Sequence, residues 1–189
     1  MVLIQNLSQK YNITLGQDSV DLLVQLLQKR VLQKDELLLE QGKVSKYMYI
    51  VEKGILRQFY YKDGRCITEH FSCQGDIASC IESLFLQEPT NINIEAIEDT
   101  VVYLLDYEQL KKLTLEHPGL CKLLQAILEY KLVVSQRKAD SWRFETANER
   151  YQRFCKEYPT AAKRAPIAYI ASYLLMAPET LSRVRAGVL

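Results

Sequence analysis

The side chains best suited to chemistry lie near the end of the chain, in a short segment that begins at Pro178. Glu179 and Arg183 are four residues apart, so on a helix they share one face. An arginine so placed can donate two hydrogen bonds to guanine, and a glutamate can accept one from cytosine. The same spacing also fits an ordinary ion pair within a helix. Taken alone, the spacing favours the ion pair.

Further polar and basic side chains surround this pair. Candidates for base or phosphate contacts are Thr180 and Ser182, and candidates for phosphate contacts alone are Lys163, Arg164 and Arg185. Residues 129–189 hold 11 Lys and Arg against 6 Asp and Glu, whereas residues 1–128 hold 13 against 17. A basic segment joined to an acidic body indicates a surface that meets a polyanion.

Two short helices are expected to position these side chains. Ala-Pro occurs at residues 165–166 and again at 177–178, and proline suits the first position of a helix. Each helix has apolar residues at helical spacing, which are Ile167, Ile170, Ala171 and Leu174 in the first and Leu181 and Val184 in the second. Two short helices with a tight connection form a helix-turn-helix pattern.

Residues that could support catalysis or hold a metal are not clustered. His70 and His117 lie far apart, and the five cysteines form no CxxC pair. The sequence has no glycine-rich phosphate loop and no GxSxG motif. We therefore expect no enzyme activity, no metal site and no cofactor, and we interpret the cysteines as free thiols in a reducing compartment.

The middle of the chain is rich in short β-forming segments. They cover residues 36–40, 47–52, 55–61, 66–71, 91–96 and 100–105. Asp63-Gly64 between two such segments is a strong hairpin signal. Strands at this spacing predict a sandwich, barrel or jelly roll. A helix is expected before them, over residues 18–32, because Val20, Leu23, Val24, Leu27 and Val31 recur at helical spacing.

A long helical span is expected after Pro118. No glycine or proline occurs from Lys122 to Tyr158, and we expect one break near residues 146–148, where Thr146 or Asn148 can cap a second helix. An apolar seam with a spacing of about 3.5 residues runs along the first part, through Leu120, Leu123, Ile127, Tyr130 and Val134. The seam fits a homodimer interface, and burial against the β-rich part is the alternative.

The order of these elements resembles the Crp–Fnr family of bacterial transcription regulators over about residues 15–189. Three motifs carry the resemblance. Residues 37–42, LLLEQG, with 47–54, YMYIVEKG, resemble the opening strands of the family's cyclic-nucleotide-binding-type domain. Gly75-Asp76-Ile77 resembles the start of its phosphate-binding cassette. Residues 178–183, PETLSR, resemble its recognition helix, and this motif is the most specific.

The resemblance implies an α+β protein in three parts. Residues 1–116 would form a cyclic-nucleotide-binding-like β-roll sensor, residues 117–145 a dimerisation helix, and residues 146–189 a helix-turn-helix DNA-binding domain. The function implied is sequence-specific transcription regulation by a homodimer on double-stranded DNA. RNA polymerase and a small-molecule effector are further candidate partners.

Two departures from the family pattern bear on the ligand and on the turn. Members that bind cyclic AMP carry Arg-Ser late in the cassette, where this chain has Thr90-Asn91. A phosphate taken out of water needs a charge-assisted donor, so we expect that cyclic AMP is not the effector of a pocket formed by Gly75, Asp76, Ile77, Thr90 and Asn91. Leu175 occupies the place of the usual turn glycine, at a cost of about 1 kcal/mol if that residue needs φ > 0.

The alternative function is a ligand-sensing β-roll protein that acts through protein partners, with the C-terminal segment as a docking element. Retention on DNA that is lost at high salt would distinguish the two functions. No stretch approaches the roughly 18 apolar residues of a membrane span, and the N-terminus lacks the pattern of a signal peptide. We expect a cytoplasmic protein without a membrane partner.

Overall fold

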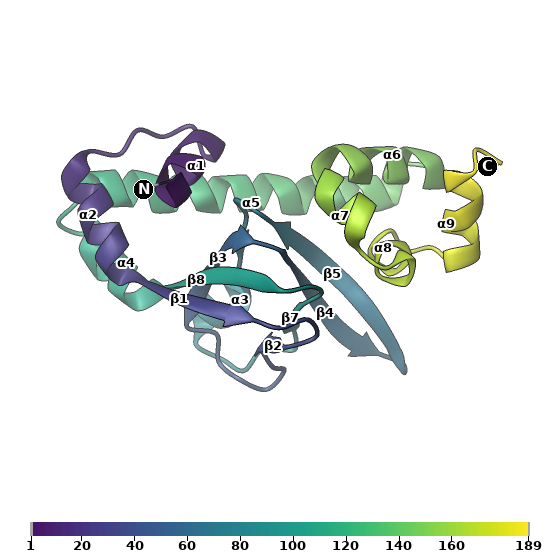
Figure 1. Ribbon diagram of the computed structural model, residues 1–189, viewed down its shortest axis with the longest axis horizontal. Helices are drawn as coiled ribbons and strands as arrows, with labels where there is room; N and C mark the ends of the chain where they lie inside the picture. The colour runs from purple at the N-terminus through teal and green to yellow at the C-terminus, as the bar shows by residue number, and fades with distance from the viewer. Residues whose placement is uncertain (1, 189) are drawn as a thin grey trace.

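The computed structural model describes residues 2–188 and has the mixed α+β architecture that the sequence predicts. In Figure 1 a β-sandwich lies along one long helix, α5, and a group of short helices follows, with α9 and the C-terminus at its outer end. The strands are β1 Leu27–Leu32, β2 Leu37–Leu39, β3 Tyr47–Lys53, β4 Ile55–Lys62, β5 Arg65–Cys73, β6 Ile77–Ala78, β7 Asn93–Ala96 and β8 Thr100–Asp106. The helices are α1 Val2–Lys10, α2 Gln17–Leu26, α3 Ile81–Leu86, α4 Tyr107–Thr114, α5 Pro118–Phe144, α6 Ala147–Glu157, α7 Pro159–Arg164, α8 Ile167–Tyr173 and α9 Pro178–Arg185.

Two antiparallel sheets of four strands form the sandwich. Their strand orders are β1-β8-β3-β6 and β2-β7-β4-β5. Apolar side chains from both sheets fill the space between them, including Leu56, Ile94 and Val102, each fully buried. The predicted hairpin is confirmed: β4 and β5 pair up to Lys62 and Arg65, and Asp63 and Gly64 have φ of 51° and 71°. Two consecutive positive φ angles fit the right-handed twist of the strands.

One boundary predicted from the sequence is wrong. The helix expected over residues 18–32 ends at Leu26, and its second half is strand β1. β1 pairs with β8 over six residues, from Leu27 opposite Leu105 to Leu32 opposite Thr100. A short apolar pattern cannot show whether an edge of a sheet is available for pairing, and here the available edge decided the outcome.

The predicted break in the long helical span is confirmed. Helix α5 ends at Phe144, and α6 begins after Thr146. The Thr146 hydroxyl accepts from the Glu149 backbone N–H, while the Glu149 carboxylate accepts from the Thr146 N–H at 2.8 Å. This reciprocal capping box satisfies backbone donors that the helix start would otherwise leave free.

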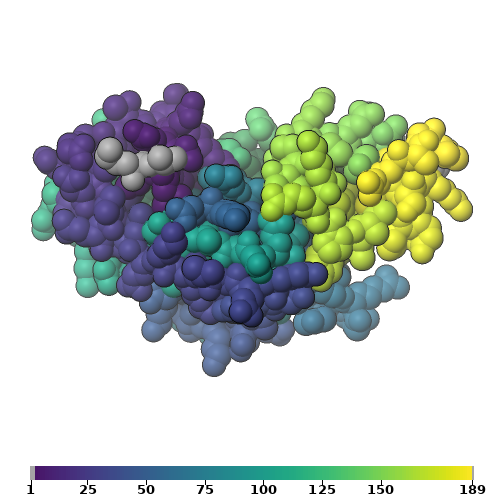
Figure 2. Space-filling view, in the orientation of Figure 1, coloured from purple at the N-terminus to yellow at the C-terminus, as the bar shows by residue number. Residues whose placement is uncertain are grey.

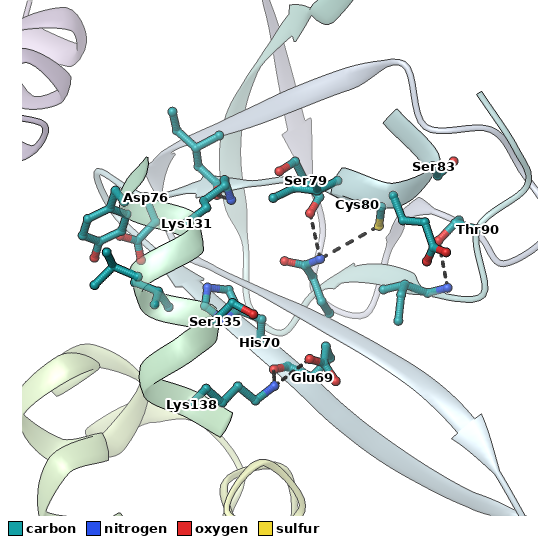
Figure 3. Close-up of a pocket in the computed structure, with 18 of the residues that line it drawn as sticks. Glu69, His70, Asp76, Ser79, Cys80, Ser83, Thr90, Lys131, Ser135 and Lys138 are labelled. Carbon is teal, nitrogen blue, oxygen red and sulfur yellow. Dashed lines mark hydrogen bonds and ion pairs between the residues drawn. The ribbon is translucent and has the colours of Figure 1, made fainter. Parts of the chain in front are cut away.

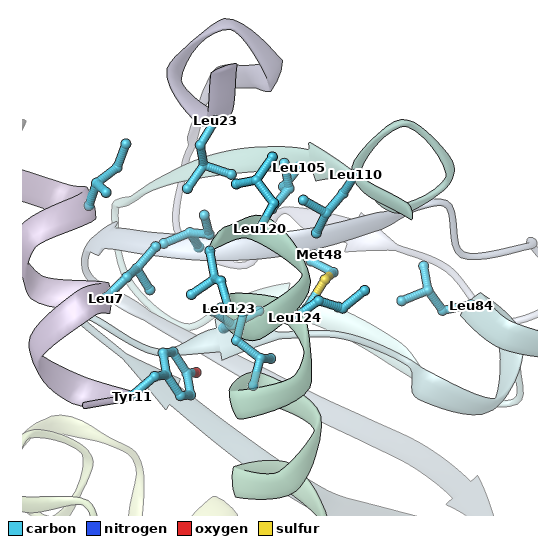
Figure 4. Packing of buried hydrophobic residues seen from close by; sticks show 14 residues of the cluster. Leu7, Tyr11, Leu23, Met48, Leu84, Leu105, Leu110, Leu120, Leu123 and Leu124 are labelled. Atoms are coloured by element: carbon cyan, nitrogen blue, oxygen red, sulfur yellow. The ribbon is translucent and has the colours of Figure 1, made fainter. Parts of the chain in front are cut away.

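The first half of α5 is packed inside the protomer, which corrects the predicted dimer seam. Leu120, Leu123 and Ile127 are each no more than 1% exposed, in a core that also contains Leu7 of α1 and Leu23 of α2 (Figure 4). These three side chains are therefore not free to contact a second chain. For these three residues the alternative, burial within the protomer, holds, because the N-terminal helices add a covering layer to the β-sandwich.

The outer half of the seam is open. Tyr130 is 43% exposed, and Val134 is half-buried. The more exposed apolar side chains of α5 are elsewhere on the helix: Leu132 is 71% exposed and Val133 is 46% exposed.

The C-terminal helices pack directly on the second sheet. A further hydrophobic cluster, besides the one between the sheets and the one around the first half of α5, joins the sheet to the helices. It contains Phe71 of β5 together with Phe154, Tyr158 and Tyr173 from the helical part. Ser172 of α8 makes a polar bridge to the same strand, accepting from the Thr68 N–H at 2.8 Å and donating to the Cys66 carbonyl at 3.2 Å. In Figure 2 the green-to-yellow C-terminal helices form a lobe in contact with the β-sandwich.

The turn between α8 and α9 has the strained backbone that the sequence analysis considered. Leu175 has φ +52°, and its N–H donates to the Ser172 carbonyl. The Met176 N–H donates to the Ala171 carbonyl, which completes a Schellman motif. Because this position of the motif favours glycine, the leucine side chain strains the turn.

We predict that Leu175→Gly stabilises the protein by about 1 kcal/mol, because glycine adopts the left-handed conformation without a Cβ clash. Leu175 is 51% exposed, so the change removes little buried surface. Urea denaturation measures the difference in unfolding free energy between the variant and the wild type, provided that both show the same dependence of this free energy on urea concentration. Ala168→Gly at an exposed position within α8 is the control and should destabilise by about 1 kcal/mol. Equal effects of the two variants would contradict the assignment of strain to the turn.

Candidate functional site

Helix α9 has a buried apolar face and, on its other side, an exposed polar face. Leu181 and Val184 are 0% and 5% exposed, and they anchor α9 in the C-terminal lobe. The residues predicted to contact bases or phosphates lie on the other side: Glu179, Ser182, Arg183 and Arg185 are exposed, and Thr180 is half-buried. Within residues 2–188 no ion pair joins Glu179 to Arg183, although both are four residues apart on the helix. Both side chains are thus available to a partner.

The two basic residues of α7 differ in their availability. Lys163 is exposed at the end of the helix. The Arg164 guanidinium instead donates two hydrogen bonds to the Glu98 carboxylate in the β7–β8 turn. Its Nε lies 3.0 Å from Oε2, and its Nη2 donates to Oε1. Arg164 therefore ties α7 to the β-sandwich, and of the two residues Lys163 is the freer candidate for a phosphate.

A second candidate site is a cavity of about 840 Å³ between α5 and the β-sandwich. Figure 3 shows that side chains from β5, the β6 region and α5 surround it. Its apolar wall includes Ile77, Ile92 and Val134, and Tyr11 and Tyr130 add aromatic surface. A cavity of this size suits a small organic ligand.

Of the cassette residues predicted for this pocket, Asp76, Ile77, Thr90 and Asn91 line the cavity, whereas Gly75 is not among the lining residues. Gly75 has φ +83°, and its N–H donates to the Val51 carbonyl. Asp76 accepts from the Cys73 N–H at 2.7 Å and forms an ion pair with Lys10. Ile77 is buried and lines the cavity.

The two residues that stand in place of Arg-Ser offer the cavity no charge. The Thr90 hydroxyl accepts from the Ile92 N–H at 3.0 Å, within its own loop, and Thr90 is 6% exposed. Asn91 lies beside it and is exposed at the rim. Neither of these two residues is a charge-assisted donor for an anion at this end of the cavity.

Three lysines that the sequence analysis did not single out supply positive charge at the opposite side. Lys10 comes from α1, and Lys131 and Lys138 come from α5, one heptad apart. Lys10 is paired with Asp76, and Lys138 with Glu69 at 2.7 Å. Lys131 Nζ donates to the Ile77 carbonyl at 2.8 Å, and no carboxylate in the described part of the chain lies within salt-bridge distance of it.

Burial and mutual repulsion control the ionisation of these groups. Burial and, to a smaller extent, the positive charge of Lys10 together lower the pKa of Lys131 to about 8. Burial is also the main reason that the pKa of His70 is lowered to about 3, with Lys131, Lys138 and Lys10 adding repulsion. His70 is therefore neutral at pH 7, and its Nδ1 lies 3.4 Å from the Tyr158 hydroxyl.

The lysine group could have been found only in part from the sequence. The spacing of Lys131 and Lys138 places them near the buried stripe of α5, where a charge is unusual. Lys10 is distant in sequence, and its position beside Asp76 depends on how α1 docks.

Comparison with known proteins supports the fold. Residues 29–117 match the family model described as the cyclic nucleotide-binding domain. The structure of FixK2 from Bradyrhizobium japonicum has a TM-score of 0.72 and 24% sequence identity, over 86% of this chain and 84% of that chain.

Two further structures are similar. For the regulator CLP of Xanthomonas campestris, which is named as responsive to c-di-GMP, the TM-score is 0.69 at 16% identity, over 92% of this chain and 91% of that one. For the catabolite activator protein of Thermus thermophilus the TM-score is 0.59 at 22% identity, over 94% and 85%. At these identities the likenesses establish the fold. No significant match was found among curated protein sequences.

Among residues 2–188, no helix combines the length and apolar character that crossing a membrane requires. The same residues contain no group of three or more His, Cys, Asp or Glu side chains placed to hold a metal ion.

We predict that Lys131→Met stabilises the protein at pH 7 by about 1 kcal/mol, because the change removes a poorly compensated buried charge and keeps the apolar stem. The folded-state pKa, about 8, lies below the value of an unfolded chain, about 10.4. The unfolded wild-type chain holds more protons between these values, so wild-type stability rises with pH there and the gain of the variant shrinks.

Denaturant unfolding at pH 7 and pH 10.5 measures this gain. Lys122→Met, at an exposed position of α5, is the control and should change the unfolding free energy little at either pH. A gain for Lys131→Met that persists at pH 10.5 would show that packing, and not charge, is responsible.

Proposed function

We propose that the protein is a dimeric, sequence-specific DNA-binding transcription regulator of the Crp–Fnr type. The observation that carries the proposal is the exposed polar face of α9, which combines an unpaired arginine and glutamate with a buried apolar anchor. The similar folds of FixK2 and the catabolite activator protein support it. The coarse conclusion, a regulator and not an enzyme, agrees with these neighbours.

The mechanism is insertion of α9 into the major groove of DNA. Arg183 donates two hydrogen bonds to guanine O6 and N7, and Glu179 accepts from a cytosine amino group. Thr180 and Ser182 contact a base or a phosphate, and Lys163 and Arg185 contact phosphates. Helix α9 lies at the outer end of the C-terminal lobe, where a duplex can approach it (Figure 1).

The homodimer forms through α5, by a stripe other than the one predicted from sequence. Alternating steps of four and three residues join Cys121, Gln125, Leu128, Leu132, Ser135 and Ala139. This stripe lies beside the buried face of the helix, and its central residue, Leu132, is 71% exposed. A two-fold dimer would present two copies of α9 to half-sites about 34–36 Å apart, which implies a near-palindromic operator.

The β-roll acts as the sensor in this proposal, and its cavity adjoins both the dimer helix and the strand on which α8 rests. Lys138 links these parts: its ammonium pairs with Glu69 of β5 and lies 5.2 Å from the Tyr173 ring of α8. A ligand that shifts α5 would therefore alter the support of the helix-turn-helix. Cyclic AMP is not the expected effector, because Asp76 and Thr90 are engaged and the cassette itself has no arginine. The arginine that lines the cavity, Arg137, belongs to α5 and is exposed.

We predict that Arg183→Ala weakens binding to the selected DNA site by about 1–3 kcal/mol and relaxes the preference for one G·C pair in each half-site. Lys163→Ala is the matched control, because a phosphate contact carries no sequence information. It should weaken binding to all sequences alike. The slope of log binding constant against log salt concentration should become less steep by about one.

Selection of binding sites from random DNA, followed by affinity measurement at several salt concentrations, separates the two effects. If Arg183→Ala leaves the selected motif unchanged, Arg183 is a phosphate contact. If the wild-type chain selects no motif and is not retained on DNA, the proposal fails and action through protein partners is favoured.

We predict that Leu132→Glu converts the dimer to monomers, raising the dissociation constant by about 1,000-fold, since about 2 kcal/mol of leucine burial is lost on each side. Val133→Glu changes the neighbouring, 46% exposed residue on a different side of α5 and should leave the dimer intact. Sedimentation at micromolar concentration distinguishes the two. Ile127→Glu is unsuitable as a test, because Ile127 is in the core and its change would unfold the chain.

A further inference from the structure

The cavity beside α5 contains a lysine that forms no ion pair with any of residues 2–188. Two of its inner lysines form closed pairs, Lys10 with Asp76 and Lys138 with Glu69. The third, Lys131, has a backbone carbonyl as its hydrogen-bond partner. The other acidic side chains that line the cavity are exposed at its rim, and they are Glu82, Glu88, Glu129 and Glu157. The inner cavity is thus one negative charge short.

A purely structural role does not explain this arrangement. An isolated ammonium group in a desolvated site is costly, and an apolar side chain of similar length could fill the same space at lower cost. The Ile77 carbonyl that Lys131 contacts carries only a partial charge. The feature is understandable if another molecule completes the pairing.

A second polar group at the same cavity also lacks a partner. Ser79 lines the cavity and is 6% exposed, and its hydroxyl makes no hydrogen bond among the described residues. Buried hydroxyl groups in folded proteins are nearly always hydrogen-bonded. Figure 3 shows Ser79 on the sandwich side of the cavity and Lys131 on α5, so the two groups flank the space from different elements.

We propose that this cavity binds a small organic monocarboxylate whose apolar body rests on the isoleucine and tyrosine side chains and whose carboxylate pairs with Lys131. One negative charge balances the site, and the exposed acids at the rim disfavour ligands of higher charge. Lysine pairs with a carboxylate as a point charge, and the cassette lacks the forked arginine that would add a bidentate contact to an anion. This inference rests on the proposed sensor role of the β-roll for its regulatory meaning, but binding itself requires no DNA.

The position of Lys131 connects the ligand to the rest of the molecule. Lys131 lies one heptad from Lys138, which contacts Glu69 of β5, Trp142 of α5 and Tyr173 of α8. A carboxylate held by Lys131 therefore fixes α5 against the β-sandwich next to the support of α8.

The test is calorimetric titration of the full-length protein, without DNA, using acids and their neutral amides. The probes are phenylacetate, benzoate and hexanoate, each with its amide, and cyclic AMP. At least one acid should bind at least tenfold more tightly than its amide and more tightly than cyclic AMP. Lys131→Met should remove the preference for the acid, Lys131→Arg should retain it, and Lys122→Met, an exposed control on α5, should leave it unchanged.

The inference is overturned if no acid binds better than its amide, if Lys131→Met keeps the preference, or if cyclic AMP binds more tightly than the acids. Retention of the ligand-free protein on DNA is measured separately. Loss of DNA binding with intact acid binding would count against the proposed function alone, and the reverse result would count against the carboxylate site alone.

Discussion

The packing of four aromatic rings is the interaction on which the relation between the two halves of the molecule depends. Phe71 of β5 lies 5.7 Å, between ring centroids, from both Phe154 of α6 and Tyr173 of α8, and Tyr158 closes the cluster at 5.8 Å from Tyr173. The rings are nearly fully buried, and truncating one such residue typically costs about 3–5 kcal/mol. A buried Arg57 adds to this contact, because its guanidinium pairs with Glu95 and stacks 3.5 Å from the Tyr169 ring centroid of α8. The C-terminal helices are therefore packed against the second sheet.

Helix α5 contributes side chains to three different surroundings, which are the core, the cavity and the outer surface. One side is sealed by the N-terminal helices, one side carries Lys131 and Lys138 into the cavity, and Leu132 faces outward. A helix of 27 residues can divide its length and circumference in this way because side chains seven residues apart return to nearly the same direction. A movement of α5 would therefore change the packing of the core, the shape of the cavity and the proposed dimer contact.

Two locally unfavourable features of the chain lie at places where function is proposed. Leu175 holds a left-handed backbone in the turn that orients α9, and Lys131 holds a charge in a desolvated cavity. Folded proteins retain such features where the surrounding structure enforces them, and they concentrate at functional positions.

The sequence by itself determined the elements with strong local signals. The Asp63-Gly64 hairpin, the helix break near residues 146–148, most of the strands from Leu37 onward and the two short C-terminal helices follow from turn chemistry, capping and periodicity, which act between residues close in the chain. The exposed face of α9 was also predictable, because Leu181 and Val184 leave one side free. The absence of an arginine in the cassette was visible directly.

Tertiary structure decided the features that depend on which surfaces meet. Residues 27–32 became a strand because β8 offered a free edge, and Ile127 became core because α1 and α2 covered it. Arg164 was taken up by Glu98, 66 residues away. Lys10, Lys131 and Asp76 came together for the same reason, since each is an ordinary polar residue until long-range packing places it in a shared cavity. The physical cause is that burial and charge pairing are properties of the assembled surfaces, which no local pattern encodes.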